Sequence, residues 1–135
     1  FVKDNNLSGR VQNLSMISQA QLVEEYHRND LCFFPSMQKI GFSRTPLEAM
    51  ACGCIVISYG NEGSDEIIRQ GENGFLVEPG NIKQVADVID RLMHQPRLLH
   101  EITTTAKQEI ENNYQIKTYI DRIEEELLKI VKHNG

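Results

Sequence analysis

The sequence is poor in several residue types and patterns that particular classes of protein require. It contains no tryptophan and only 7% aromatic residues, which disfavours the stacking platforms that bind single-stranded nucleic acids. Its three cysteines are too few, and odd in number, for a small disulfide-stabilised secreted scaffold. No apolar run approaches the ~20 residues that cross a bilayer. The opening FVKDNNLSGR lacks the segments of a signal peptide, and we expect a cytoplasmic protein.

Charge and histidine spacing exclude further classes. Lys and Arg number 14 against 19 Asp and Glu, a net charge of −5, so no nucleic-acid partner is expected, because phosphate binding needs a surplus of basic charge. The four histidines and the Cys52-Gly53-Cys54 segment show none of the spacings typical of zinc sites. We therefore expect no metal and no cofactor, and cysteines that are reduced and packed as small apolar residues.

The rest of the sequence alternates short strands with helices. Apolar or β-branched runs predict strands, and capping residues followed by apolar residues three and four apart predict helices. Strands are expected at 11–14, 31–34, 55–58 and 75–77, and helices at 18–29, 45–53, 64–70, from 82 until Pro96, and 98–132 with a break near 112–113.

This alternation predicts the α/β class. We expect residues 1–135 to form a single domain with a Rossmann-like, mainly parallel sheet and helices on both faces. The strands at 31–34 and 55–57 are apolar enough to be central, with both faces buried. The apolar stripe between Ile116 and Ile130 is expected to pack into the core. Ligands bind at the carboxyl ends of parallel strands, which points to the loops after Phe34, Ser58 and Val77.

The segment around Thr45 combines several features of an anion site. Thr45 is predicted as the N-cap of a helix with Pro46 at its first position, and Glu48 stands where a capping box places its acid. Gly41 permits close approach of a ligand to the backbone, because it has no Cβ atom. The N–H groups at the start of the helix favour an anion, to which Arg44 can add a bidentate contact.

Two segments of the sequence are distinctive: GFSRTPLEAMACGCIVIS and, further along, EIIRQGENGFLVEPGN. Together they resemble the donor-nucleotide half of group 1 (family 4) glycosyltransferases of the GT-B fold. The resemblance extends over nearly the whole chain and corresponds to the latter part of the C-terminal domain. It implies a hexosyltransferase that takes part in polysaccharide biosynthesis. Such an enzyme moves a hexose, with retention, from a nucleotide-sugar to a glycan or lipid acceptor, in some members at the inner face of the membrane.

The resemblance also implies a set of donor-binding residues. Glu48 corresponds to the second glutamate of the family's paired motif and would accept hydrogen bonds from the ribose hydroxyls, although the capping box with Thr45 competes for the same oxygens. Glu66 is assigned a structural role in the first turn of the helix after strand 55–58. The expected donor-binding residues are Gly41, Phe42, Ser43, Arg44, Thr45, Leu47 and Glu48, and no catalytic residue is assigned.

Two departures from the family pattern affect the expected activity. Ile40 stands eight positions before Glu48, where the family has its first glutamate, and isoleucine accepts no hydrogen bond. The family's acceptor domain, and two strands carrying an Arg and a Lys that neutralise the leaving diphosphate, have no counterpart in the chain. We therefore expect the chain alone to be inactive.

The strand order that the resemblance implies, 3-2-1-4-5-6, leaves a gap of two strands beside 31–34, at roughly 4.8 Å each. Either the natural chain is longer, the strand at 11–14 pairs directly with 31–34, or another copy fills the gap by self-association. Two other functions remain open. One is a catalytically degenerate module that binds a nucleotide or a partner subunit. The other is a sugar-nucleotide epimerase of the same fold.

Overall fold

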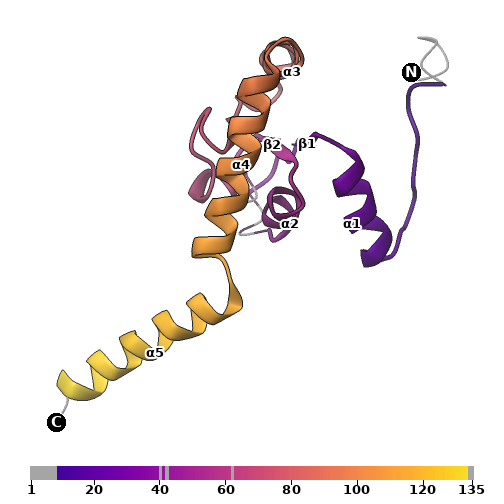
Figure 1. Cartoon of the computed structure of the whole chain (residues 1–135). Helices are drawn as coiled ribbons and strands as arrows, with labels where there is room; N and C mark the ends of the chain where they lie inside the picture. The colour runs from indigo at the N-terminus through magenta and orange to yellow at the C-terminus, as the bar shows by residue number, and fades with distance from the viewer. Residues whose placement is uncertain (1–8, 40, 42, 62, 134–135) are drawn as a thin grey trace.

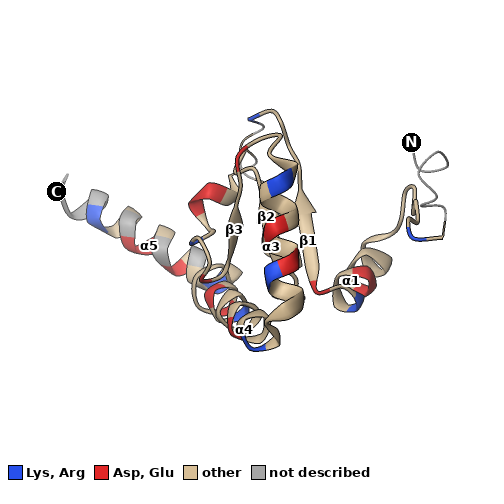
Figure 2. Ribbon diagram, turned by 90° about the horizontal axis from the view of Figure 1, so that it is seen from above, with Lys and Arg blue, Asp and Glu red and all other residues tan. Residues whose placement is uncertain are grey.

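A computed structural model describes residues 9–39, 41, 43–61 and 63–133 of the chain. A small sheet of three parallel strands runs in the order β1-β2-β3, and Figures 1 and 2 show helices around it. The strands are β1 (Leu31–Phe34), β2 (Ile55–Ser58) and β3 (Gly74–Leu76). The predicted parallel sheet and α/β class are confirmed.

Most of the predicted helices are present. They are α1 (Gln19–Arg28), α2 (Thr45–Ala51), the 3₁₀ helix η1 (Ser64–Glu66), α3 (Ile82–His94), α4 (Pro96–Asn113) and α5 (Ile116–His133). The capping box predicted for α1 forms between Ser18 and Gln21, and the Asn81 side chain caps α3 by accepting the Gln84 N–H at 3.0 Å. These local signals act within a few residues, which is why the sequence alone predicts them.

The core lies on both faces of β2, whose residues are all buried. Val56 packs on the side covered by α1 and α2, whereas Ile55 and Ile57 pack on the side covered by α3. Helix α4 reaches both sides, with Ile102 on the α3 side and Ile110 on the other. Burying one such aliphatic side chain stabilises the fold by roughly 1.5–3 kcal/mol. The expectation of helices on both faces is therefore confirmed.

The N-terminal strand and the burial of β1 were predicted wrongly. Residues 11–14 form no strand, and Val11 and Leu14 are 52% and 37% exposed. Among the described residues, no strand lies beside 11–14, and these residues do not pair with β1. Strand β1 is at the edge of the described sheet, so its four residues are half-buried rather than buried on both faces.

The helix predicted at 64–70 is reduced to the single turn of η1. The Arg69 N–H donates to Asn73 Oδ1 at 2.7 Å instead of to a carbonyl one turn earlier. The Asn73 side chain also donates to the Ile67 carbonyl at 3.0 Å. A buried asparagine therefore folds the chain into a turn ahead of β3, because its amide offers the backbone an alternative to helical hydrogen bonds.

Helix α5 leads away from the sheet (Figure 1). Its described apolar side chains are exposed, with Ile116 at 78% and Leu127 at 56%. The prediction that this stripe packs into the core is wrong for those side chains, since α5 has few neighbours other than the end of α4. Among the described residues, no helix combines the length and apolar character that crossing a bilayer requires.

Candidate functional site

The loops after β1 and β2 meet beyond the carboxyl ends of these strands. They enclose a pocket of about 170 Å³, at the edge of the sheet where the sequence pattern places a ligand. The first loop contributes Lys39 and Gly41. The second contributes Gly60, Asn61, Gly63, Asp65 and Glu66. We call this hollow the strand-end pocket.

Glycines shape both walls of the strand-end pocket. Gly41, Gly60 and Gly63 have φ angles of 77°, 79° and 81°, in the left-handed region that costs other residues roughly 1–2 kcal/mol. A Cβ atom on Gly60 would lie 3.2 Å from Asp65 Cβ, whereas one on Gly41 would meet nothing within 4 Å. The wall after β2 is therefore the more closely packed of the two.

Hydrogen bonds hold the wall after β2 against the core. The buried hydroxyl of Ser58 accepts the Gly60 N–H at 2.8 Å and lies 2.6 Å from the hydroxyl of Ser64. The Asn61 Nδ2 atom donates to the Ser36 carbonyl in the other loop at 2.8 Å. The sequence analysis did not identify Asn61, because no local pattern reveals a bond across 25 positions.

The strand-end pocket is lined by three charged side chains, those of Lys39, Asp65 and Glu66. Within the described part of the chain, Lys39, Asp65 and Glu66 make neither an ion pair nor a side-chain hydrogen bond. Carboxylates accept hydrogen bonds and an ammonium group donates them, so the lining suits a ligand with hydroxyl groups. In the described ranges, no three His, Cys, Asp or Glu side chains are grouped to hold a metal ion.

The start of α2 differs from its prediction. Arg44 is the N-cap and makes no side-chain capping bond, so Thr45 is the first helical residue and not the cap. The Thr45 N–H donates to the Oγ atom of Ser43, two positions earlier in the loop, at 3.3 Å. Leu47 packs against the core beside α1, and Phe42 lies outside the described residues.

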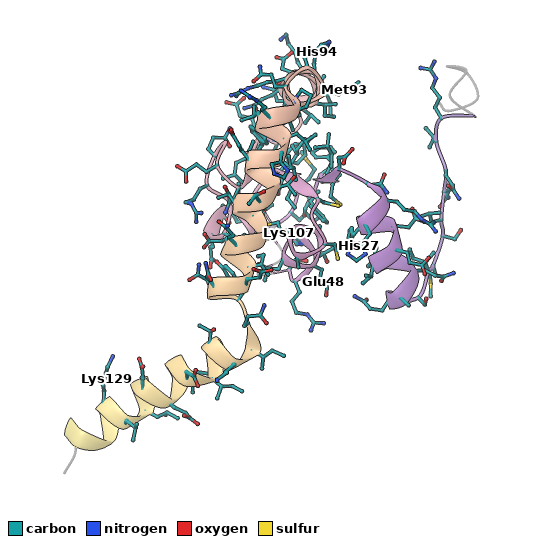
Figure 3. All side chains as sticks on the ribbon, viewed as in Figure 1. His27, Glu48, Met93, His94, Lys107 and Lys129 are labelled. Atoms are coloured by element: carbon teal, nitrogen blue, oxygen red, sulfur yellow. The ribbon has the colours of Figure 1, made fainter. Side chains whose placement is uncertain are left out.

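Glu48 lies on α2, outside the strand-end pocket. It is half-buried, and its position is labelled in Figure 3. Burial raises the pKa of Tyr26 in α1 to about 12, and the charge of Glu48 contributes to that rise. The proposed capping bond from the Thr45 N–H to Glu48 does not form, so the carboxylate is unengaged among the described residues. Of the predicted donor-binding residues that the structure describes, Gly41 alone lines the pocket.

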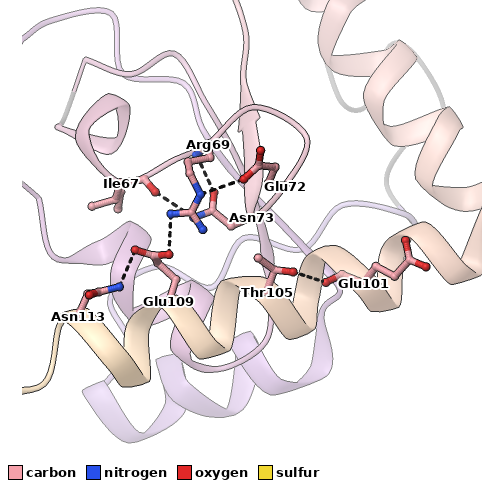
Figure 4. A network of polar contacts seen from close by, with 8 residues as sticks. All are labelled: Ile67, Arg69, Glu72, Asn73, Glu101, Thr105, Glu109 and Asn113. Carbon is pink, nitrogen blue, oxygen red and sulfur yellow. Dashed lines mark hydrogen bonds and ion pairs between the residues drawn. The ribbon is translucent and has the colours of Figure 1, made fainter.

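A second polar cluster surrounds the turn before β3 (Figure 4). Arg69 bonds Glu72 at 3.0 Å and Glu109 of α4 at 2.6 Å, and these hydrogen bonds raise the pKa of Arg69. Asn73 completes the cluster. A hollow of about 290 Å³ beside it is lined by Gly71, Glu72, Leu98, Glu101, Ile102 and Thr105. We call it the turn hollow.

Comparisons with known proteins agree on one family. The sequence model described as "Glycosyl transferases group 1" matches residues 2–109. An exopolysaccharide phosphotransferase of Streptomyces coelicolor is 34% identical over 103 residues, which is 70% of this chain and 11% of that protein. The C-terminal domain of LpcC, a group 1 glycosyl transferase of Francisella tularensis, has 31% identity and a TM-score of 0.75, and covers 85% of this chain and 59% of that one.

A second solved structure shows a ligand. The Anabaena protein HepE in complex with UDP-glucose has 25% identity and a TM-score of 0.82. The alignment covers 95% of this chain and 35% of HepE. The chain therefore spans less than two thirds of the length of each of these three proteins.

Proposed function

The chain belongs to the group 1 glycosyl transferases and has the Rossmann-like fold of their GT-B C-terminal domains, and we propose that it binds the nucleotide-sugar donor of a retaining hexosyltransferase. The acceptor is a glycan or a lipid, and the enzyme works on the cytoplasmic side of the membrane in polysaccharide biosynthesis. The observation that carries the proposal is the strand-end pocket, with glycine walls and charged groups that have no partner among the described residues.

The chemistry of the strand-end pocket favours the sugar over the diphosphate. One ammonium group and two carboxylates line it, so its described charge does not attract an anion. Hexose hydroxyls both donate and accept, which suits Asp65, Glu66 and Lys39. We place the hexose here. The relationship to HepE, whose structure holds UDP-glucose, supports a nucleotide-sugar as the ligand. The name of the Streptomyces relative describes a protein of which this chain matches 11%, so we carry no reaction over from it.

Glu48 is proposed as the ribose ligand. Its carboxylate is half-buried and is unengaged among the described residues, and a carboxylate can accept from two vicinal hydroxyls. Ser43, Arg44 and Thr45 lie between Glu48 and Gly41 along the chain, and we propose that the diphosphate lies along this segment. Ile40 and Phe42 lie outside the described residues.

Calorimetric titration with UDP, UDP-glucose and other sugar nucleotides tests this function. The unaltered chain should bind at least one of them, and Glu48→Ala should weaken binding by about tenfold or more, the loss expected for hydrogen bonds to a charged group. Glu101→Ala, in the turn hollow, is the matched control and should bind normally. Binding by no nucleotide would contradict the proposal and favour an interaction module, and equal binding by Glu48→Ala would remove the ribose role.

Two further proposals concern turnover and self-association of the chain. We propose that residues 1–135 by themselves bind donor without transferring sugar, because preorganised charge at the leaving phosphate supplies much of the rate in such reactions, and the Arg and Lys that the family resemblance implies for this role match no residue among these 135. Strand β1 presents an open edge among the described strands, which favours pairing with another copy. Light scattering over a concentration series should show association, and a monomer at all concentrations would contradict it.

A further inference from the structure

The Asn61 side chain joins the two walls of the strand-end pocket. At the end of the β1–β2 ladder, the Tyr59 N–H reaches the Phe34 carbonyl at 3.4 Å, which is long for a backbone bond. Two residues further on, Asn61 Nδ2 donates to the Ser36 carbonyl at 2.8 Å. The hydrogen bond from the Asn61 side chain is therefore shorter than the last backbone hydrogen bond between β1 and β2.

The two walls differ in how they are anchored. The wall after β2 is held by the buried hydroxyls of Ser58 and Ser64. The wall after β1 is exposed at most described positions, including Met37 at 65%, and its internal bond from Ser36 Oγ to the Gln38 carbonyl spans only two residues. Among the described residues of this wall, the Ser36 carbonyl makes its hydrogen bond to the wall after β2, and the donor is Asn61.

We propose that Asn61 is a positioning residue for the donor: it fixes the distance between the wall carrying Lys39 and Gly41 and the wall carrying Asp65 and Glu66. This inference rests on the proposed function of the pocket. Groups that must contact one sugar from opposite sides act together only if their separation is set before binding, since ordering a loop on binding costs free energy. The role differs from direct contact with the sugar, although Asn61 also lines the pocket.

Hydrogen–deuterium exchange of the chain without nucleotide separates positioning from contact. Two variants remove the bond: Asn61→Ala deletes the donor, and Asn61→Asp keeps the size but places an oxygen opposite the Ser36 carbonyl. Both should accelerate exchange at residues 36–39 and leave α3 unchanged. Asn112→Ala, an exposed asparagine on α4, is the matched control and should match the unaltered chain. Unchanged exchange at 36–39 in both Asn61 variants would overturn the inference.

Titration with UDP-glucose completes the test. Loss of one such hydrogen bond should weaken binding about five- to tenfold in both Asn61 variants and not in Asn112→Ala. Equal binding by the unaltered chain and the Asn61 variants would overturn the positioning role while leaving the proposed function intact. Absence of UDP-glucose binding by the unaltered chain would count against the proposed function, and would overturn the donor role of Asn61 with it.

Discussion

The strand-end pocket and the polar cluster beside the turn hollow both contain charged side chains, but these side chains differ in whether they have partners. In the turn hollow's cluster, Arg69 bonds Glu72 and Glu109, and Asn73 satisfies two backbone groups (Figure 4). In the strand-end pocket, Lys39 and the two acids have no partner among the described residues. Polar groups that satisfy one another stabilise the fold, whereas unengaged groups at a concave surface remain available to a ligand.

This difference predicts separable effects of substitution. Changes in the cluster beside the turn hollow should alter the free energy of unfolding and leave donor binding unchanged. Changes in the strand-end pocket should alter donor binding. A variant beside the turn hollow that weakens donor binding, or a variant in the strand-end pocket that leaves donor binding unchanged, would contradict this difference.

The largest loss of stability is expected from Asn73→Ala. Asn73 is fully buried, and its removal leaves the Arg69 N–H and the Ile67 carbonyl without their partners. Two such groups should cost about 2–4 kcal/mol of unfolding free energy, measured by urea denaturation against Asn112→Ala. A loss no larger than that of the control would show that the turn holds without this side chain.

Gly60→Ala and Gly71→Ala form a matched pair, one in each hollow. Their φ angles of 79° and 75° predict a similar strain of roughly 1–2 kcal/mol in the unfolding free energy. Only Gly60→Ala should also weaken UDP-glucose binding, because its Cβ would push against Asp65 at 3.2 Å. Equal affinities in calorimetric titration of the two variants would contradict the assignment of the donor to the strand-end pocket.

Glu109→Gln should have a small effect. The Arg69 side chain is 46% exposed and that of Glu109 is 17% exposed, so solvent screens the ion pair and its loss should cost about 1 kcal/mol or less. Urea denaturation at low and high salt measures it, and the difference between the variant and the unaltered chain should shrink as salt rises. If Glu109→Gln lost more unfolding free energy than Asn73→Ala, the ion pair and not the buried asparagine would be the main stabilising contact of the cluster.

Two cysteines that pack in the core should make the free energy of unfolding depend on pH. Burial raises the pKa of Cys32 to about 11 and that of Cys54 to about 12. The folded chain thus keeps protons that the unfolded chain releases from about pH 9, so stability should be constant through neutral pH and fall as pH rises from about 9 towards 11. Urea midpoints across this range test it. Cys54→Ala should show a shallower fall, and an identical fall would exclude that thiol as a source.

Local signals account for what the sequence predicted correctly. The Ser18–Gln21 capping box, the Asn81 cap and the apolar run of β2 each depend on neighbouring residues, and all three are present. The errors concern long-range contacts. Residues 11–14 form no strand because no described strand lies beside them, and the helix after Ser64 ends early because Asn73 captures the Arg69 N–H.

The candidate site shows the same division. The loops after β1 and β2 were predicted from the alternation of strands and helices, and Gly41 lies in the lining. Asn61 was missed because its partner is in another loop. Lys39 also lies in the lining, but no motif in the sequence marks it as a site residue. The prediction of Thr45 as the N-cap is wrong because the helix begins one residue earlier: Arg44 is the N-cap, and the Thr45 N–H donates to the hydroxyl of Ser43.

Amide chemical-shift mapping during titration with UDP-glucose shows which of the two hollows binds the ligand, because each hollow is lined by at least one glycine whose amide signal can be followed. The signals of Gly41, Gly60 and Gly63 should shift with a common dissociation constant, while that of Gly71 should not. Shifts centred on Gly71 and Thr105, or no shift at any of these amides at saturating ligand, would contradict the assignment of the nucleotide-sugar to the strand-end pocket.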